Sequence, residues 1–224
     1  MGRLFDLDSP VMRFLSKMAD LMILNFITLI CCIPIITIGA SITALHYVLL
    51  KMVRNEEGYI VKSFFKPFRQ NFKQATIIWL IILVFLIIFV ADIFVFNYSG
   101  IEFPAVFRIV LLAMAFFASM MLCYIFPLLS RFENTIFRTI KNALLMSILS
   151  FPKTLLMLLV YALPVIALYF TAMAMPLIFL FGISAPAYAA AMLYSGTFKR
   201  FEPQEEPIKD RFEIEAESES DGKQ

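Results

Sequence analysis

The chain has 224 residues, of which 61% are hydrophobic and 25 are phenylalanine, and its mean hydropathy is +0.85. A soluble domain is usually about 45–50% apolar, so this composition excludes an ordinary soluble protein and predicts an integral membrane protein. The formal charge of +2 is divided unevenly, because residues 1–200 hold 16 Lys and Arg against 8 Asp and Glu, whereas residues 201–224 hold 3 against 9.

The first hydrophobic region, residues 18–52, follows a short N-terminal segment, residues 1–17, and is too long for one span. As a single helix it would measure about 52 Å, against a hydrocarbon core of roughly 30 Å. Pro34 and Gly39 lie near its middle, where proline removes a helical hydrogen bond and glycine relaxes the backbone. We therefore predict a break and two short helices, which either cross the membrane or form a re-entrant pair. The two helices are expected at residues 18–34 and 38–52.

Four further stretches are each long and apolar enough to span a bilayer, which takes about 20 such residues. They are residues 75–96, 104–129, 155–173 and 175–194. Connections without Lys or Arg join the first to the second and the third to the fourth, so each pair is expected to form a tight hairpin. The sequence therefore predicts an all-α, polytopic membrane helix bundle of six membrane segments within residues 18–200.

Basic residues indicate which connections are cytoplasmic. All but one of the 19 Lys and Arg residues lie near the N-terminus, in or beside two connections at about 54–74 and 130–153, or near the C-terminus. Because short basic loops stay in the cytoplasm, we expect both termini and both connections there. Residues 201–224 are acidic and poor in apolar side chains, so this segment is expected to be a disordered cytoplasmic tail.

Both basic connections have the pattern of an amphipathic helix. Apolar residues recur every four positions, with Lys or Arg between them: Ile60, Phe64, Phe68 and Phe72 in the first, and Phe132, Ile136, Ile140 and Leu144 in the second. Such helices lie in the headgroup region, so we expect both to anchor on membrane lipids, with docking of a partner as the alternative. Each precedes a hairpin, which hints at a repeat of residues 59–129 and 131–196, and repeats are common in transporters.

Ionisable residues inside a membrane are costly and are therefore candidates for a functional role. Asp92 and Arg108 are equally far from the middle of the 97–103 connection, so they are expected at the same depth on neighbouring helices. An ion pair between them would either hold the hairpin together or serve as a gate or binding group.

His46 is the only histidine of the chain. With a turn near residue 36, it falls at the depth of Asn25 to Thr28 on the preceding helix, and polar side chains on facing helices commonly form hydrogen bonds. A structural hydrogen bond is the favoured interpretation. A proton relay is the alternative, for which Asp20 is the available carboxylate.

The sequence lacks the spacings that support catalysis or cofactor binding. A single histidine excludes a histidine metal cluster, and no HExxH, GxSxG or GxxxxGK[ST] pattern occurs. Cys31, Cys32 and Cys123 lie in apolar runs without CxxC spacing, which indicates buried thiols rather than a disulfide or a metal site. We therefore expect a protein that is not an enzyme, with no catalytic residues, no cofactor, no metal and no nucleic-acid partner.

Several segments of the first third resemble the YesL-like family of uncharacterised bacterial membrane proteins. They are residues 14–21, 32–45, 54–59, 63–65 and 71–75. The resemblance implies a multi-pass protein of the bacterial plasma membrane. It also implies a link to sugar uptake, because the family is often encoded beside carbohydrate importers.

These observations lead to one expected function and one alternative. We expect a non-enzymatic membrane protein that is accessory or regulatory to a carbohydrate ABC importer, with the importer's permease subunits and membrane lipids as partners. The alternative is a small transporter or channel, which would need a polar cavity lined by several helices. The substrate and any homo-oligomeric state do not follow from the sequence.

The predicted topology can be tested by single-cysteine labelling in a cysteine-free background. A cysteine at position 55 or 134 should react with a membrane-permeant maleimide but be protected from an impermeant one added outside. Labelling of either position by the impermeant reagent in intact cells would contradict the cytoplasmic placement of that connection.

Overall fold

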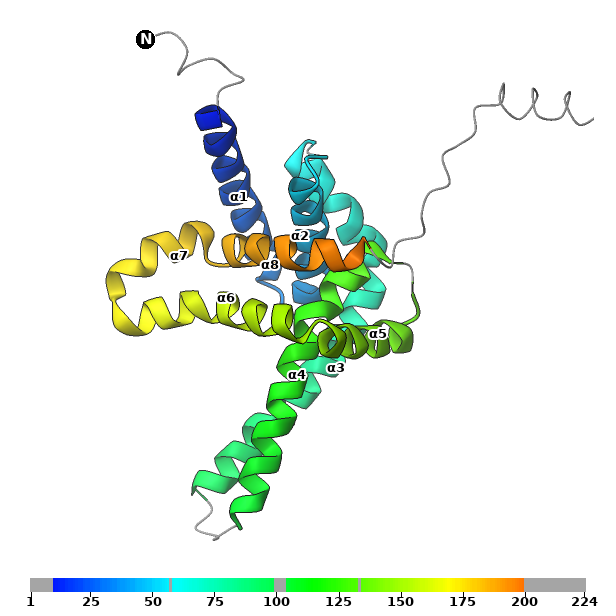
Figure 1. The fold of residues 1–224 in the computed structure, drawn as a ribbon, viewed down its shortest axis with the longest axis vertical. Helices are drawn as coiled ribbons and strands as arrows, with labels where there is room; N and C mark the ends of the chain where they lie inside the picture. The colour runs from blue at the N-terminus through cyan, green and yellow to red at the C-terminus, as the bar shows by residue number, and fades with distance from the viewer. Residues whose placement is uncertain (1–9, 57, 99–103, 133, 200–224) are drawn as a thin grey trace, which may run out of the picture.

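The computed structural model describes residues 10–56, 58–98, 104–132 and 134–199, and these residues contain helices and no strand (Figure 1). The α-helices are α1 (Pro10–Cys32), α2 (Ile38–Val53), α3 (Ile60–Tyr98), α4 (Ala105–Arg131), α5 (Ile136–Leu149), α6 (Phe151–Phe170), α7 (Met175–Phe181) and α8 (Ser184–Phe198), with 3₁₀ turns η1 (Ile35–Thr37) and η2 (Ala172–Ala174). Five helices of the described chain are long and apolar enough to cross a membrane, or up to six if α7 and α8 count as one bent span. The protein is therefore an all-α, multi-pass membrane protein. The expected acidic tail lies outside the described residues.

The predicted break in the first hydrophobic region is confirmed. α1 ends at Cys32 and α2 begins at Ile38, and the two helices form a hairpin (Figure 1). The Thr37 hydroxyl donates to the backbone oxygens of Cys31 and Pro34, at 2.6 and 2.7 Å. The Pro34 oxygen also accepts the N–H of Thr37 at 3.0 Å, so these bonds close the turn.

Helix α3 holds this turn in place. The indole N–H of Trp79 donates to the backbone oxygen of Ile35 at 2.8 Å. The Thr76 hydroxyl donates to the backbone oxygen of Ile36 at 3.4 Å. A Cβ atom on Gly39 would lie 2.5 Å from the backbone oxygen of Ala75 and 2.7 Å from the Trp79 Cβ. Gly39 therefore lets α2 approach α3 closely, a role that tertiary packing gives it beyond relaxing the backbone at the break.

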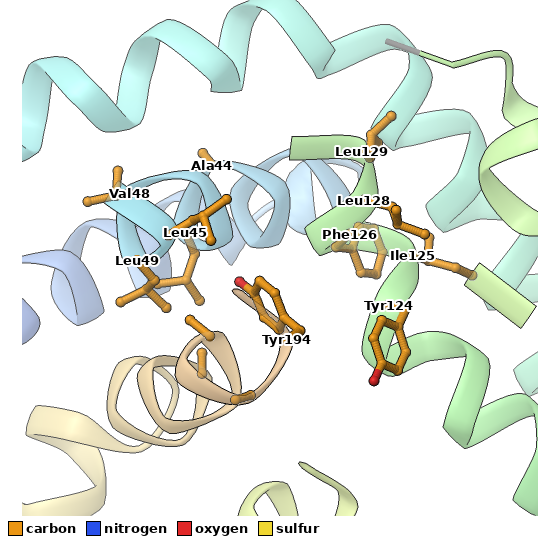
Figure 2. Close-up of a cluster of buried hydrophobic side chains, with 14 of the residues drawn as sticks. Ala44, Leu45, Val48, Leu49, Tyr124, Ile125, Phe126, Leu128, Leu129 and Tyr194 are labelled. Atoms are coloured by element: carbon orange, nitrogen blue, oxygen red, sulfur yellow. The ribbon is translucent and has the colours of Figure 1, made fainter. Parts of the chain in front are cut away.

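Helix α2 is the centre of the molecule. Most of its residues are buried, and it packs against α1, α3, α4 and α8. Figure 2 shows Leu45 and Leu49 on the side of α2 that faces Tyr194 of α8, and Ala44 and Val48 on the side toward α3. The labelled residues of α4 lie on the other side of Tyr194. The small residues Gly39, Ala40 and Ala44 allow these close contacts.

The first amphipathic connection is not a separate interfacial helix, which corrects part of the expectation. α3 continues without a break from Ile60 to Tyr98, although Pro67 lies within it. Ile60 and Phe64 of the predicted apolar stripe are buried in the protein core instead of facing lipid, whereas Phe72 is exposed. The stripe turns inward because α2 packs along this part of α3.

The second connection does form a separate helix, α5, which packs on α4. Its buried residues are Thr139, Ala143, Met146 and Ser147. The predicted stripe lies beside this face, since Ile136 and Ile140 are partly buried and Leu144 is exposed. The exposed side of α5 combines Phe137, Leu145 and Ile148 with Arg138 and Lys141, the composition expected of a helix at a membrane surface.

The two long hairpins point in different directions. α3 and α4 run together to one end of the molecule, whereas α6 and α7 form a second arm that lies crosswise to them (Figure 1). Both arms expose apolar side chains along their length, including Phe85 and Phe94 on α3 and Leu159 and Val165 on α6.

Gly39→Ala tests the close approach of α2 and α3. The added methyl group has no room, so the variant should be destabilised by about 1–3 kcal/mol, the usual cost of overpacking. Gly196→Ala in α8 is the matched control, because its Cβ would meet no atom closer than 3.9 Å and alanine favours a helix. The measurement is unfolding in detergent followed by the fluorescence of Trp79, the single tryptophan. Equal stability of the two variants would contradict the packing argument.

Candidate functional site

The last predicted span, residues 175–194, is not one continuous helix. The structure divides it into α7 and α8, whose axes differ by 59° across Gly182 and Ile183. The prediction of an unbroken span was therefore wrong. Pro186 supplies the reason, since it lacks an N–H and its ring clashes with the carbonyl four residues earlier, that of Gly182. A side chain at Gly182 would in turn collide with the backbone of Ile178.

Asn25 of α1 fills the gap in the hydrogen bonds of the broken helix. In an unbroken helix the N–H of Ile183 would donate to the carbonyl of Phe179. Here the Asn25 Oδ1 accepts from the N–H groups of Ile183 and Ser184, both at 3.0 Å, and its Nδ2 donates to the Phe179 oxygen at 2.9 Å. One side-chain amide thus bridges the two backbone groups that the break separates, and it caps the start of α8.

The bridge is buried on its inner side, whereas the Phe179 side chain is 61% exposed. Asn25 and Ser184 are each 0% exposed, and the Phe26 ring contacts the Phe179 ring edge-on with centroids 5.3 Å apart. The Ser184 hydroxyl is buried and has no hydrogen-bond partner in the described part of the chain. The bridge therefore satisfies three backbone groups at the break but leaves one buried hydroxyl beside it without a hydrogen bond in the described chain.

His46 makes a structural hydrogen bond, but not to the helix we predicted. Its Nδ1 lies 3.1 Å from the Tyr194 hydroxyl of α8, and the two rings meet edge-on. The hydroxyl of Thr28 donates instead to the Leu24 carbonyl of its own helix. His46 is 4% exposed, so this bond fastens α2 to α8 within the core. Asp20 is partly buried on α1.

Asp92 and Arg108 lie on α3 and α4 of the same hairpin, as predicted, and both are exposed. Among the described residues the structure shows no ion pair between them. Both side chains extend from the outer surface of the hairpin, where long polar side chains can reach toward the headgroups. Their functional role stays a prediction.

The site holds helices together, and its one buried polar group without a partner in the described chain is the Ser184 hydroxyl. It carries no set of groups for acid–base chemistry. No three His, Cys, Asp or Glu side chains in the described ranges are placed to hold a metal ion. An amide beside a helix start is suited to binding rather than to bond cleavage. The broken α7–α8 helix is similar in kind to the interrupted helices that contact substrates in transporters.

Two residues of this site escaped the sequence analysis. Pro186 follows Gly182 by four positions, the spacing that breaks a helix, and this signal was present in the sequence. Tyr194 gave no comparable signal, because its meeting with His46 depends on how α8 packs across α2.

Comparison with known proteins gives one match. A sequence profile of the family described as "Protein of unknown function, DUF624" matches residues 21–93. No curated protein and no solved structure matches the chain. The matched region runs from α1 through α2 into α3, so it contains Asn25, Gly39 and His46 but neither Pro186 nor Tyr194. The chain is thus similar to an uncharacterised family over residues 21–93, about a third of its length.

Replacing Asn25 by the similarly sized Leu should loosen the α7–α8 break. Three backbone groups would lose their partner, and a buried unsatisfied group costs about 1–3 kcal/mol. Hydrogen exchange in detergent should therefore become faster at Ile183 and Ser184. Thr28→Val is the control, since it removes a buried hydroxyl of the same helix that bonds only within α1. Unchanged exchange at both amides in Asn25→Leu would contradict the bridging role.

Proposed function

We propose that this protein is a non-enzymatic component of the bacterial plasma membrane that binds the permease subunits of a carbohydrate ABC importer and assists or regulates the importer. The chain's resemblance to the YesL-like family supplies the link to carbohydrate uptake. The structure supports the more general part of the proposal, that the protein acts by helix contacts inside the membrane.

The observation that carries the proposal is the divergence of the two apolar arms (Figure 1). In the most apolar 18-residue stretch of α3 only 6% of the residues are buried inside the protein, against 61% in the corresponding stretch of α2. A shallow hollow on α3 is lined by Ile77, Leu80, Ile81, Val84 and Phe85, all apolar. Lipid can cover such a surface, and so can transmembrane helices of another protein that fit between the arms.

The internal polar groups also favour a partner-binding role over transport. Asn25, Thr28, Thr43 and His46 are all buried, and each makes a hydrogen bond within the protein. Asn25 and His46 join different helices, and Thr28 and Thr43 bond to carbonyls of their own helices. A transport path instead requires polar groups that face a cavity.

A transporter is the second candidate, and the broken α7–α8 helix is the observation that favours it. Interrupted helices near the middle of the membrane often contact substrates, and the buried Ser184 hydroxyl beside the break has no partner within the described chain. For this candidate, the purified protein alone in liposomes should take up labelled sugars. Asn25→Leu should lower that uptake, and Thr28→Val should leave it unchanged.

Site-specific photo-cross-linking in native membranes tests the leading proposal. A benzophenone amino acid replaces Phe85 in the hollow on α3, or Phe94 on the same helix outside the hollow. The two phenylalanines are 69% and 63% exposed, so they are matched in residue type and accessibility. We expect the probe at position 85 to form an adduct with a permease subunit of a carbohydrate importer, identified by mass spectrometry, and the probe at position 94 to form much less.

Two results would overturn the proposal. One is an adduct pattern that is the same at both positions, as expected for random collisions in the membrane. The other is labelling of lipid alone at position 85 while the importer is present in the same membrane.

A further inference from the structure

The first half of α3 has two opposite faces. Ile60, Phe64, Pro67 and Ala75 are buried on one face. Lys62, Lys66, Arg69 and Lys73 are all exposed and recur at helical spacing on the other, where we call them the basic stripe. Phe65 and Phe72, which are 38% and 37% exposed, lie along one flank of this stripe.

Most of the basic stripe extends beyond the reach of lipid headgroups. After Lys73 the next charged residue along the chain is Asp92, so the hydrocarbon part of α3 begins near Ala75. Lys66 and Lys62 precede Lys73 by 7 and 11 residues, which is about 10 and 16 Å of helix at about 1.5 Å per residue. The headgroup layer is only about 5–8 Å thick on each side. An upright α3 therefore carries its outer lysines past that layer into water.

The C-terminal end of α8 lies beside this part of the protein. The Phe198 ring contacts the Phe132 ring at the end of α4, with centroids 5.5 Å apart. Two residues further along, the Asn134 oxygen accepts a hydrogen bond from Gln74 of α3 at 2.6 Å. The chain that follows Phe198 thus begins close to the inner end of the basic stripe.

We propose that the acidic tail, residues 201–224, docks on the basic stripe of α3. The tail carries 9 Asp and Glu against 3 Lys and Arg, and five of its carboxylates lie between Glu213 and Asp221 without a basic residue among them. Phe212 and Ile214 precede and interrupt this acidic run, so they can contact Phe65 and Phe72 on the flank of the stripe. An extended chain reaches about 3.3 Å per residue, which brings position 215 within range of the whole stripe.

Tethering favours the tail over other acidic polypeptides in the cell. A segment joined to the same chain is present at a high effective concentration, so several weak, exposed ion pairs suffice to keep it in place. Because such pairs are screened by salt, docking should weaken as ionic strength rises. This inference does not depend on the importer, since it concerns contacts within one chain.

The test is cross-linking of the full-length protein in lipid nanodiscs of phosphatidylcholine. In a background in which Cys31, Cys32 and Cys123 are replaced by alanine, the pair Lys66→Cys and Glu215→Cys should cross-link rapidly with a short bis-maleimide. The pair Arg13→Cys and Glu215→Cys is the control, because Arg13 is also basic and exposed but lies at the start of α1. We expect the control pair to react about tenfold more slowly.

Charge reversal decides whether electrostatics drive the contact. Adding Arg69→Glu and Lys73→Glu to the Lys66 pair should slow cross-linking about tenfold, and adding Glu213→Lys and Glu217→Lys as well should restore it. Equal rates for the Lys66 and Arg13 pairs, or no effect of the reversal, would overturn the proposal. Cross-linking that occurs in phosphatidylcholine but is lost when anionic phosphatidylglycerol is included would also overturn it, since lipid headgroups would then occupy the stripe.

Discussion

Every backbone N–H and C=O group that lies in lipid must find a partner within the protein, because water is absent there. The protein meets this requirement at two breaks between helices. At the turn after α1, the Trp79 indole of α3 donates to the carbonyl of Ile35, and at the α7–α8 break Asn25 of α1 bonds to both sides of the gap. Each interruption is thus stabilised by a side chain from a different helix, which ties the irregular segments to the rest of the bundle.

The same contacts fix the depth of the α1–α2 hairpin relative to α3. The turn lies beside Thr76 and Trp79, at the start of the long uncharged stretch of α3. At the other end, Lys17 donates to the Asn55 side chain at 3.0 Å, which joins the open ends of the hairpin. The hairpin therefore packs along the basic half of α3. This position favours the re-entrant arrangement, in which the turn enters the hydrocarbon and does not cross it.

The molecule consequently divides into parts with different surroundings. Helix α2, helix α8 and the C-terminal part of α4 form a packed core. Within it, His46 and Tyr194 form a hydrogen bond. The α3–α4 and α6–α7 arms extend from this core with apolar surfaces that only lipid or other membrane helices can cover. The first half of α3 and the exposed side of α5 carry exposed basic side chains. Partner binding is proposed for the apolar arms and tail docking for the first half of α3, so both can occur in one molecule.

The sequence alone determined the position of most apolar segments, the break after Pro34 and the pairing of α3 with α4 into a hairpin, because these depend on composition and local backbone chemistry. The break at Gly182 was also encoded locally, through Pro186, although we did not predict it. Only the tertiary structure decided that Ile60 and Phe64 turn inward, that His46 meets Tyr194, and that Asn25 bridges the broken helix. Those outcomes depend on the rotation of each helix about its axis, and those of His46 and Asn25 also depend on contacts between residues more than 100 positions apart. A pattern of neighbouring residues specifies neither.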